Sequence, residues 1–179
     1  PSPIVAAAPV MPLLGPARDA AAQVAEIDAW TAHLADDATV SVSHLEADDF
    51  AHLAAILSRA DSRPRLALCL DTCHVHAAGY DVVSRDGWRR TLDELDAACG
   101  LGLVRVIHAN DSKKERGCRV DRHERIGRGA IGPKGFANLM TEPAFEDVAK
   151  ILETPKDDEG RWDREGLAEL RRLARRKSG

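Results

Sequence analysis

The 179-residue sequence lacks the features that mark several classes of protein. Its apolar start, residues 1–16, is too short and too often interrupted by proline to span a membrane, and it has no positively charged segment typical of a secretory signal. The four cysteines do not have the spacing of a zinc ribbon, so we expect reduced, mostly structural thiols. No internal repeat is found. We therefore expect a monomer inside the cell that does not bind membranes, cytoplasmic if bacterial and nuclear or mitochondrial if eukaryotic.

What the sequence does contain is a set of oxygen and imidazole donors of the kind that zinc and similar divalent ions accept. The six candidates are Asp71, His74, His108, Asp121, His123 and Glu153. Three of the four segments that carry them follow short apolar runs, at residues 66–70, 103–107 and 148–152. Such runs predict buried parallel strands, and barrel enzymes keep their chemistry at the C-terminal ends of these strands. The pattern predicts a polynuclear metal site at the mouth of a β/α barrel.

Each candidate also has an ordinary interpretation. Asp71 fits a helix cap or a loop residue, His74 and His123 fit surface histidines, and Glu153 fits a solvated strand end. The combination favours metal binding, because a buried carboxylate without a partner costs several kcal/mol. A metal ion is a common partner that satisfies three carboxylates and three histidines together.

Several longer motifs resemble the endonuclease IV family. They are CLDTCH at 69–74, AAGYD at 77–81, HANDSK at 108–113, DRH at 121–123 and LETP at 152–155. The resemblance extends from about residue 49 to residue 155. It implies a zinc-dependent DNA repair endonuclease that cuts double-stranded DNA 5′ to abasic sites, built on a β/α barrel related to xylose isomerase.

The resemblance also implies a distribution of ligands. His74, Asp121 and His123 would form one complete site, and Asp71, His108 and Glu153 most of a second, so that catalysis runs through ligands such as Asp71 and Glu153. The family's bridging glutamate falls on Asp37, for which a solvated acidic turn is the alternative. The family implies three zinc ions, and this chain is expected to hold about two, because two further family histidines have no counterpart here.

The length predicts a partial barrel, since a full β/α barrel takes about 250 residues. We expect a divergent N-terminal segment at 1–45, irregular and then with a helix at 17–35 and a short strand at 39–43. Residues 46–179 are expected to form the C-terminal portion of the barrel domain, so the predicted fold class is α/β, half of a TIM-type barrel. Its predicted strands are 65–71, 103–108 and 147–153. One helix is predicted to begin near residue 49, and three more are predicted at 84–99, 133–140 and 163–177. Loops are predicted at 76–83 and 109–132.

The net charge of −4 argues against general affinity for DNA, but the segment from 113 to 134 is locally basic. It lies beside the metal motifs, and a long loop in a compact domain is usually functional. The candidate DNA contacts are Lys113, Arg119, Arg122 and Arg125. A solvated loop with ordinary charge pairs is the alternative.

Two other functions stay open at this point. A metal-dependent sugar isomerase or epimerase would also place Glu, Asp and His at strand ends, although the Asp-Arg-His motif in a basic loop argues against it. A non-catalytic remnant would bind zinc or DNA without cutting, and would hold two ions or fewer.

Overall fold

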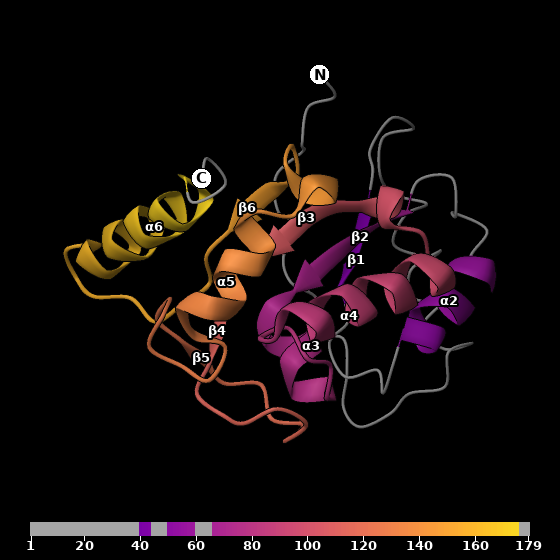
Figure 1. Cartoon of the computed structure of the whole chain (residues 1–179), viewed down its shortest axis with the longest axis horizontal. Coiled ribbons are helices and arrows are strands. Elements are labelled where there is room, and N and C mark those ends of the chain that lie inside the picture. Colours follow the sequence, from indigo (N-terminus) through magenta and orange to yellow (C-terminus); the bar gives the residue numbers. More distant parts are fainter. Residues whose placement is uncertain (1–39, 44–49, 60–65, 176–179) are drawn as a thin grey trace.

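The computed structural model describes residues 40–43, 50–59 and 66–175, and its centre is a four-stranded parallel sheet (Figure 1). The strands are β1 (Val40–Ser43), β2 (Leu66–Asp71), β3 (Val104–His108) and β6 (Ala149–Ile151), in the spatial order β1-β2-β3-β6. Every pairing in this sheet is parallel, as the sequence predicts from its alternating strands and helices.

Strand β2 is buried along its whole length, which explains its uninterrupted apolar sequence from Leu66 to Leu70. Its last residue, Asp71, pairs with His108 at the end of β3, and His108 pairs in turn with Ile151 at the end of β6. The register therefore brings the C-terminal ends of three strands together at one edge of the domain.

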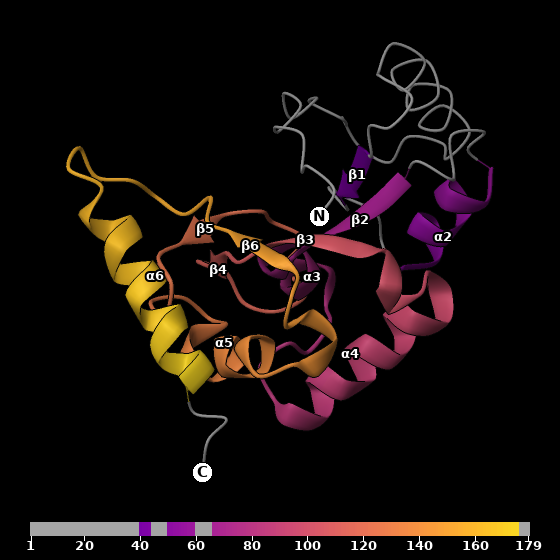
Figure 2. The same ribbon diagram turned by 90° about the horizontal axis from the view of Figure 1, so that it is seen from above.

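Four helices pack around this sheet, and Figure 2 shows α4 and α5 covering the same side of it. Their bounds are Phe50–Arg59 for α2, Arg85–Ala98 for α4, Gly132–Met140 for α5 and Arg161–Ala174 for α6. Short 3₁₀ turns lie at Leu101–Leu103 and Pro143–Phe145. The fully buried side chains at their interface include Ile107, Phe136, Phe145 and Leu173. This core holds the strands in place, and a site can form at their C-terminal ends.

Three elements differ from the sequence prediction. Residues Thr72–Ala78 form a helix, α3, although a loop was expected from residue 76, because the carboxylate of Asp71 caps the first turn. The helix ends at Gly79, whose φ of 115° is a conformation that a side chain would disfavour. The long loop contains a small antiparallel pair, β4 (Asp111–Ser112) with β5 (His123–Glu124), and β6 ends at Ile151, before Glu153.

The arrangement of parallel strands and covering helices is that of a TIM-barrel-like α/β fold, and the strands of the described residues do not close into a barrel. In the described part of the chain, no helix is long and apolar enough to cross a membrane. The helix expected at 17–35 and the candidate ligand Asp37 lie outside the described residues.

Candidate metal centre

The first cluster of candidate ligands forms where β2, β3 and the segment after β6 meet. Nδ1 of His108 lies 2.9 Å from Oε2 of Glu153 and 3.6 Å from Oδ2 of Asp71. One donor atom from each of the three residues lies within 4.8 Å of the others. The strand register accounts for this convergence, because it aligns Asp71 with His108 and ends β6 beside them.

The two oxygens of Asp71 have different partners. Oδ1 accepts hydrogen bonds from the backbone amides of Cys73, at 2.8 Å, and His74, at 3.1 Å, and so caps α3. Oδ2 faces the cluster, 4.0 Å from Nε2 of His123. The helix-cap interpretation and the ligand interpretation of Asp71 are therefore compatible, because each uses a different oxygen.

The second cluster joins α3 to the long loop. Nε2 of His74 lies 3.1 Å from Oδ2 of Asp121, and Nε2 of His123 lies 3.0 Å from Oδ1 of the same carboxylate. Sγ of Cys73 lies 3.6 Å from Oδ1 of Asp121, so a buried thiol borders this cluster as well. All six described candidates thus lie in overlapping groups of donors, because Asp71 groups with His108 and Glu153 and also with His74 and His123.

Asn110 binds two candidate ligands of the first cluster and lies beside the second, with Nδ2 3.5 Å from Nε2 of His123, and it was not singled out from the sequence. It is fully buried, and its Nδ2 donates to Oδ2 of Asp71 at 2.8 Å and to Oε2 of Glu153 at 3.4 Å. Its Oδ1 accepts from the backbone amide of Glu153 at 2.9 Å, which fixes the segment after β6. The available signal was its position, two residues beyond His108 in HANDSK, where the strand has ended and a polar side chain still faces inward.

Asp111 has an equally central place and was also missed. This fully buried carboxylate accepts five backbone N–H groups, from Ser112, Gly127, Gly129, Ile131 and Gly132. Gly129 approaches so closely that a Cβ there would lie 2.6 Å from Oδ1 of Asp111 and would overlap the Ser112 carbonyl oxygen. The side chain of Asp111 therefore stabilises the C-terminal end of the loop that carries Asp121 and His123.

The contacts between histidines and carboxylates set the ionisation of the first cluster. Burial alone would lower the pKa of His108, but hydrogen bonds with Asp71, Cys69 and Glu153 raise it to about 12. Burial alone would raise the pKa of Asp71, and its contacts with His108 and the other histidines leave it lowered instead. Contact with His108 also lowers the pKa of Glu153. Without an ion, one proton on His108 neutralises part of the charge of two carboxylates.

The second cluster behaves in the same way. Hydrogen bonds from His123 and His74 hold the pKa of Asp121 far below its usual range, and the same contact with Asp121 raises the pKa of His123. The thiol of Cys73 has the opposite tendency, because burial raises its pKa to about 12. In each group the imidazoles and carboxylates therefore favour one another's charged forms.

The donor set fits a divalent ion of the zinc type. Imidazole nitrogens and carboxylate oxygens bind zinc at about 2.0–2.2 Å, so ligands of one ion lie roughly 3–4 Å apart, as these donors do. A bound cation would replace the imidazole protons as the partner of the carboxylates.

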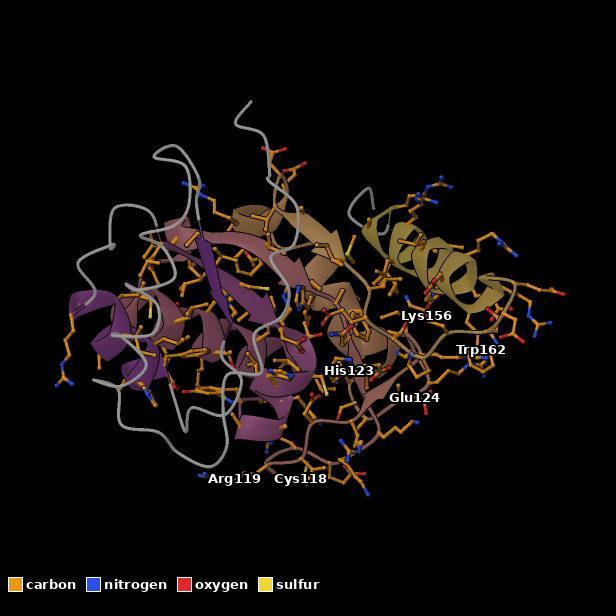
Figure 3. All side chains as sticks on the ribbon, turned by 180° about the vertical axis from the view of Figure 1, so that it is seen from behind. Cys118, Arg119, His123, Glu124, Lys156 and Trp162 are labelled. Atoms are coloured by element: carbon orange, nitrogen blue, oxygen red, sulfur yellow. The ribbon has the colours of Figure 1, made fainter. Side chains whose placement is uncertain are left out.

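The basic candidates of the loop have different surroundings. Lys113 and Arg125 lie beside hollows next to the metal centre. Arg122 donates to the backbone oxygen of Asp121 at 2.9 Å and is otherwise exposed. Figure 3 shows Arg119 and Cys118 at the outer edge of the loop, apart from His123 and Glu124. Arg119 has a left-handed backbone, with φ of 55°.

Comparison with known proteins agrees with this architecture. The model of the xylose isomerase-like TIM barrel family matches residues 31–175. The chain belongs to this family. A probable endonuclease 4 of Geobacter sulfurreducens is 48% identical over 129 residues, which are 72% of this chain and 44% of the relative. A probable endonuclease 4 of Geobacter sp. strain M21 is 47% identical over 124 residues, which are 69% of this chain and 44% of the relative.

Among solved structures, endonuclease IV from Thermus thermophilus superposes on this chain with a TM-score of 0.62 at 37% sequence identity. The matched region covers 72% of this chain and 45% of the Thermus thermophilus chain. The predicted membership of the endonuclease IV family is confirmed by these relatives. The chain spans about half the length of the curated relatives it matches.

Proposed function

We propose that this chain carries the C-terminal metal-binding part of a DNA repair endonuclease that hydrolyses the phosphodiester bond 5′ to abasic sites. The observation that supports it best is the convergence of six candidate ligands from separate strand ends and one loop. Overlapping groups of donors, with Asn110 holding Asp71 and Glu153, suit a reaction in which both the attacking and the leaving oxygen of a phosphate need stabilisation.

In this proposal Asp71, His108 and Glu153 hold one zinc ion, and His74, Asp121 and His123 hold another. Bound zinc would polarise the phosphate and supply a water of lowered pKa as the nucleophile. Asp37 is proposed as a further ligand, in the place of the family's bridging glutamate. The relatives bear the name endonuclease 4, which supports DNA as the substrate, and double-stranded DNA with an abasic site is the proposed form.

The chain's own residues prepare the ligands. Nδ1 of His123 lies 3.1 Å from the backbone oxygen of Glu153, so an Nδ1–H donated to this carbonyl leaves the lone pair of Nε2 facing Asp121. Asn110 holds the carboxylates of Asp71 and Glu153 in one orientation. Lys113 and Arg125 supply positive charge for the phosphates of the strand.

The test is nicking of a duplex with one abasic site by the 179-residue chain, with zinc, after chelation and after zinc is restored. We expect weak nicking that chelation abolishes and zinc restores, and no cutting of an undamaged duplex. The substitution His123→Asn should remove this activity.

Two other outcomes decide between the alternatives. Zinc binding without any nicking would identify a non-catalytic remnant. Turnover of a ketose by a chain that leaves abasic DNA intact would identify a sugar isomerase or epimerase.

A further inference from the structure

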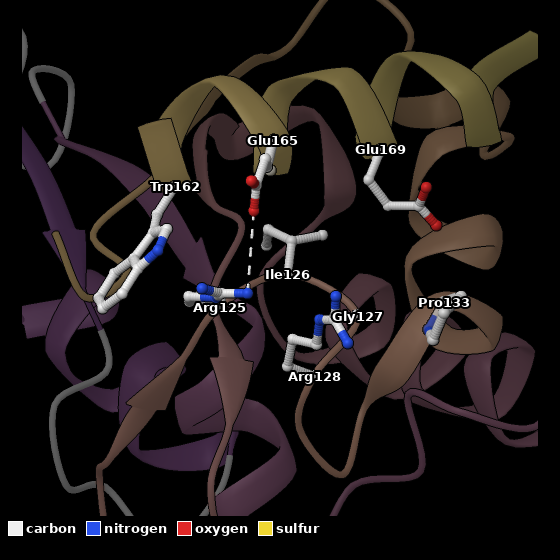
Figure 4. A pocket seen from close by; sticks show the side chains of 9 residues that line it. Arg125, Ile126, Gly127, Arg128, Pro133, Trp162, Glu165 and Glu169 are labelled. Carbon is white, nitrogen blue, oxygen red and sulfur yellow. Dashed lines mark ion pairs between the residues drawn. The ribbon is translucent and has the colours of Figure 1, made fainter. Parts of the chain in front are cut away.

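Two hollows lie between the long loop, which carries Asp121 and His123, and the start of α6. One has a volume of about 350 Å³ and the other about 470 Å³. They share Arg125, Arg128 and Trp162, so they form neighbouring parts of one groove. Figure 4 shows the smaller hollow. We call this hollow surface the Trp162 groove. None of the three residues is a candidate metal ligand, and only Arg125 is already proposed to supply charge for the phosphates.

The groove begins beside ligands of both clusters. Glu124 and Arg125 directly follow His123, and Pro155 lies two residues after Glu153. Lys113 belongs to the same wall, because its backbone amide donates to the oxygen of Arg122 at 2.8 Å. The larger hollow is therefore lined by residues one or two positions beyond candidate ligands of both clusters.

The charge of the larger hollow of this groove suits an anion, whereas the smaller hollow is also lined by the carboxylates of Glu165 and Glu169. Lys113, Arg125 and Arg128 line the larger hollow against one carboxylate, that of Glu124, which already accepts the backbone amide of Arg125 at 2.8 Å. Among the described residues, no ion pair involves Lys113 or Arg128. Two cations thus face the groove without a fixed carboxylate partner.

Arg125 is held in place by two other contacts. Its guanidinium lies 4.7 Å from the centre of the Trp162 ring, and Nη2 lies 3.8 Å from Oε2 of Glu165. Figure 4 shows Arg125 between these two side chains, with Arg128 nearby. A guanidinium stacked on an indole keeps its edge N–H groups available for a phosphate, and little side-chain entropy remains to be lost on binding.

We infer that the Trp162 groove binds a backbone phosphate of the DNA strand whose scissile phosphate occupies the metal centre. Lys113 and Arg128 contact the phosphate directly, and Trp162 positions Arg125 for the same purpose. Phosphates follow one another roughly every 3.4 Å along the axis of each strand, and Glu124 and Pro155 attach the larger hollow to the segments that carry His123 and Glu153, so a phosphate close to the cut is the one we assign to it. This inference rests on the proposed function, because it takes DNA as the polymer.

The experiment measures binding of the full 179-residue chain to an abasic duplex, with chelator present so that no cutting occurs, over a range of salt concentrations. Each lost phosphate contact lowers the slope of log affinity against log salt by about 0.9. We expect Lys113→Gln and Arg128→Gln each to lower the slope by about this amount and to weaken binding roughly tenfold, equally on abasic and undamaged duplex. Arg89→Gln, which removes the same charge from an exposed position on α4, should change neither value.

A second variant tests the positioning role. Trp162→Leu keeps every charge but frees Arg125, so it should weaken binding and leave the salt slope unchanged. Thermal unfolding of each variant excludes loss of fold as the cause. Slopes equal to that of the parent chain for both Lys113→Gln and Arg128→Gln would overturn the inference.

Measurements on the parent chain and the groove variants also distinguish failure of this inference from failure of the proposed function. If the parent chain nicks abasic DNA and the groove variants bind with the parental slope, the groove is not a phosphate site and the endonuclease proposal stands. If the groove variants lower the slope but the parent never nicks with zinc, the groove binds DNA and the proposed activity is wrong.

Discussion

Nδ2 of Asn110 donates a hydrogen bond of 2.8 Å to Oδ2 of Asp71, and the same nitrogen lies 3.4 Å from Oε2 of Glu153. One neutral amide thereby holds two carboxylates that would otherwise repel each other. Since Oδ1 of Asn110 also binds the backbone amide of Glu153, the residue fixes both the position and the direction of a candidate ligand. Residues of this kind orient metal ligands without touching the ion.

The first prediction is that Asn110→Ala weakens zinc binding by about 10–100-fold, the usual effect of removing a group that orients ligands. Competition with a chelator of known affinity measures it. The matched control is Asn138→Ala, which removes a buried amide that binds the carbonyl of Val83 at 3.0 Å, away from the ligands. The control should lose stability but keep its zinc affinity, and parental affinity in Asn110→Ala would refute the role of Asn110.

The second prediction concerns Glu153→Gln. The change keeps the size of the side chain but removes a charge that pairs with His108 at 2.9 Å, so fewer zinc ions should be retained per chain. Elemental analysis after dialysis measures this number. Glu159→Gln, at an exposed position, is the control. Zinc content equal to the parent in both variants would reduce Glu153 to a solvated carboxylate after a strand.

The sequence predicts the ends of β2 and β3 well, and physical reasons explain why. Residues 66–70 are continuously apolar because β2 is buried throughout, so the polar Asp71 marks its end. His108 marks the end of β3 in the same way. The parallel register then brings these two residues together without further information. The endonuclease IV motifs added the pairing of Asp121 with His123, which apolar periodicity alone does not reveal.

The same reasoning fails where one polar side chain determines a local fold. The helix α3 has six buried residues, including two histidines, so it shows no alternation of apolar and polar positions. The role of Asp111 depends on amides up to 21 residues away, which no local pattern encodes. The structural role of such side chains can be identified only from the folded structure.

The third prediction is that Asp111→Asn loosens the long loop. The carboxylate accepts five N–H groups with two oxygens, whereas an amide has one oxygen and points its own N–H groups at the remaining donors. Leaving buried donors unpaired costs about 1–3 kcal/mol each. We expect a lower free energy of unfolding in urea and faster tryptic cleavage after the basic residues between 113 and 128.

The control for this experiment is Asp93→Asn on the exposed face of α4, which should behave as the parent in both measurements. Cleavage of Asp111→Asn at the parental rate would show that the loop keeps its shape without this anchor.

The last prediction concerns acid stability and Asp81. Burial alone would raise the pKa of this carboxyl, but it accepts hydrogen bonds from the hydroxyl and amide of Ser84 and from the amide of Val83, and Arg116 lies 3.3 Å away. Together these contacts lower its pKa from 3.8 to about 2. A carboxyl whose pKa is lower in the folded protein than in the unfolded chain stabilises the fold fully at pH values above its unfolded-state pKa. This contribution disappears as the pH falls through its folded-state pKa.

Asp81→Asn should therefore reduce the free energy of unfolding at pH 7 by about 2 kcal/mol at most, the amount that such a shift represents. The difference between parent and variant should stay constant down to about pH 4 and then shrink as the pH falls towards 2. Urea unfolding at a series of pH values measures it, with Asp158→Asn as an exposed control. A difference that stays the same from pH 7 to pH 2 would show that Asp81 acts through the shape of its side chain and not through its charge.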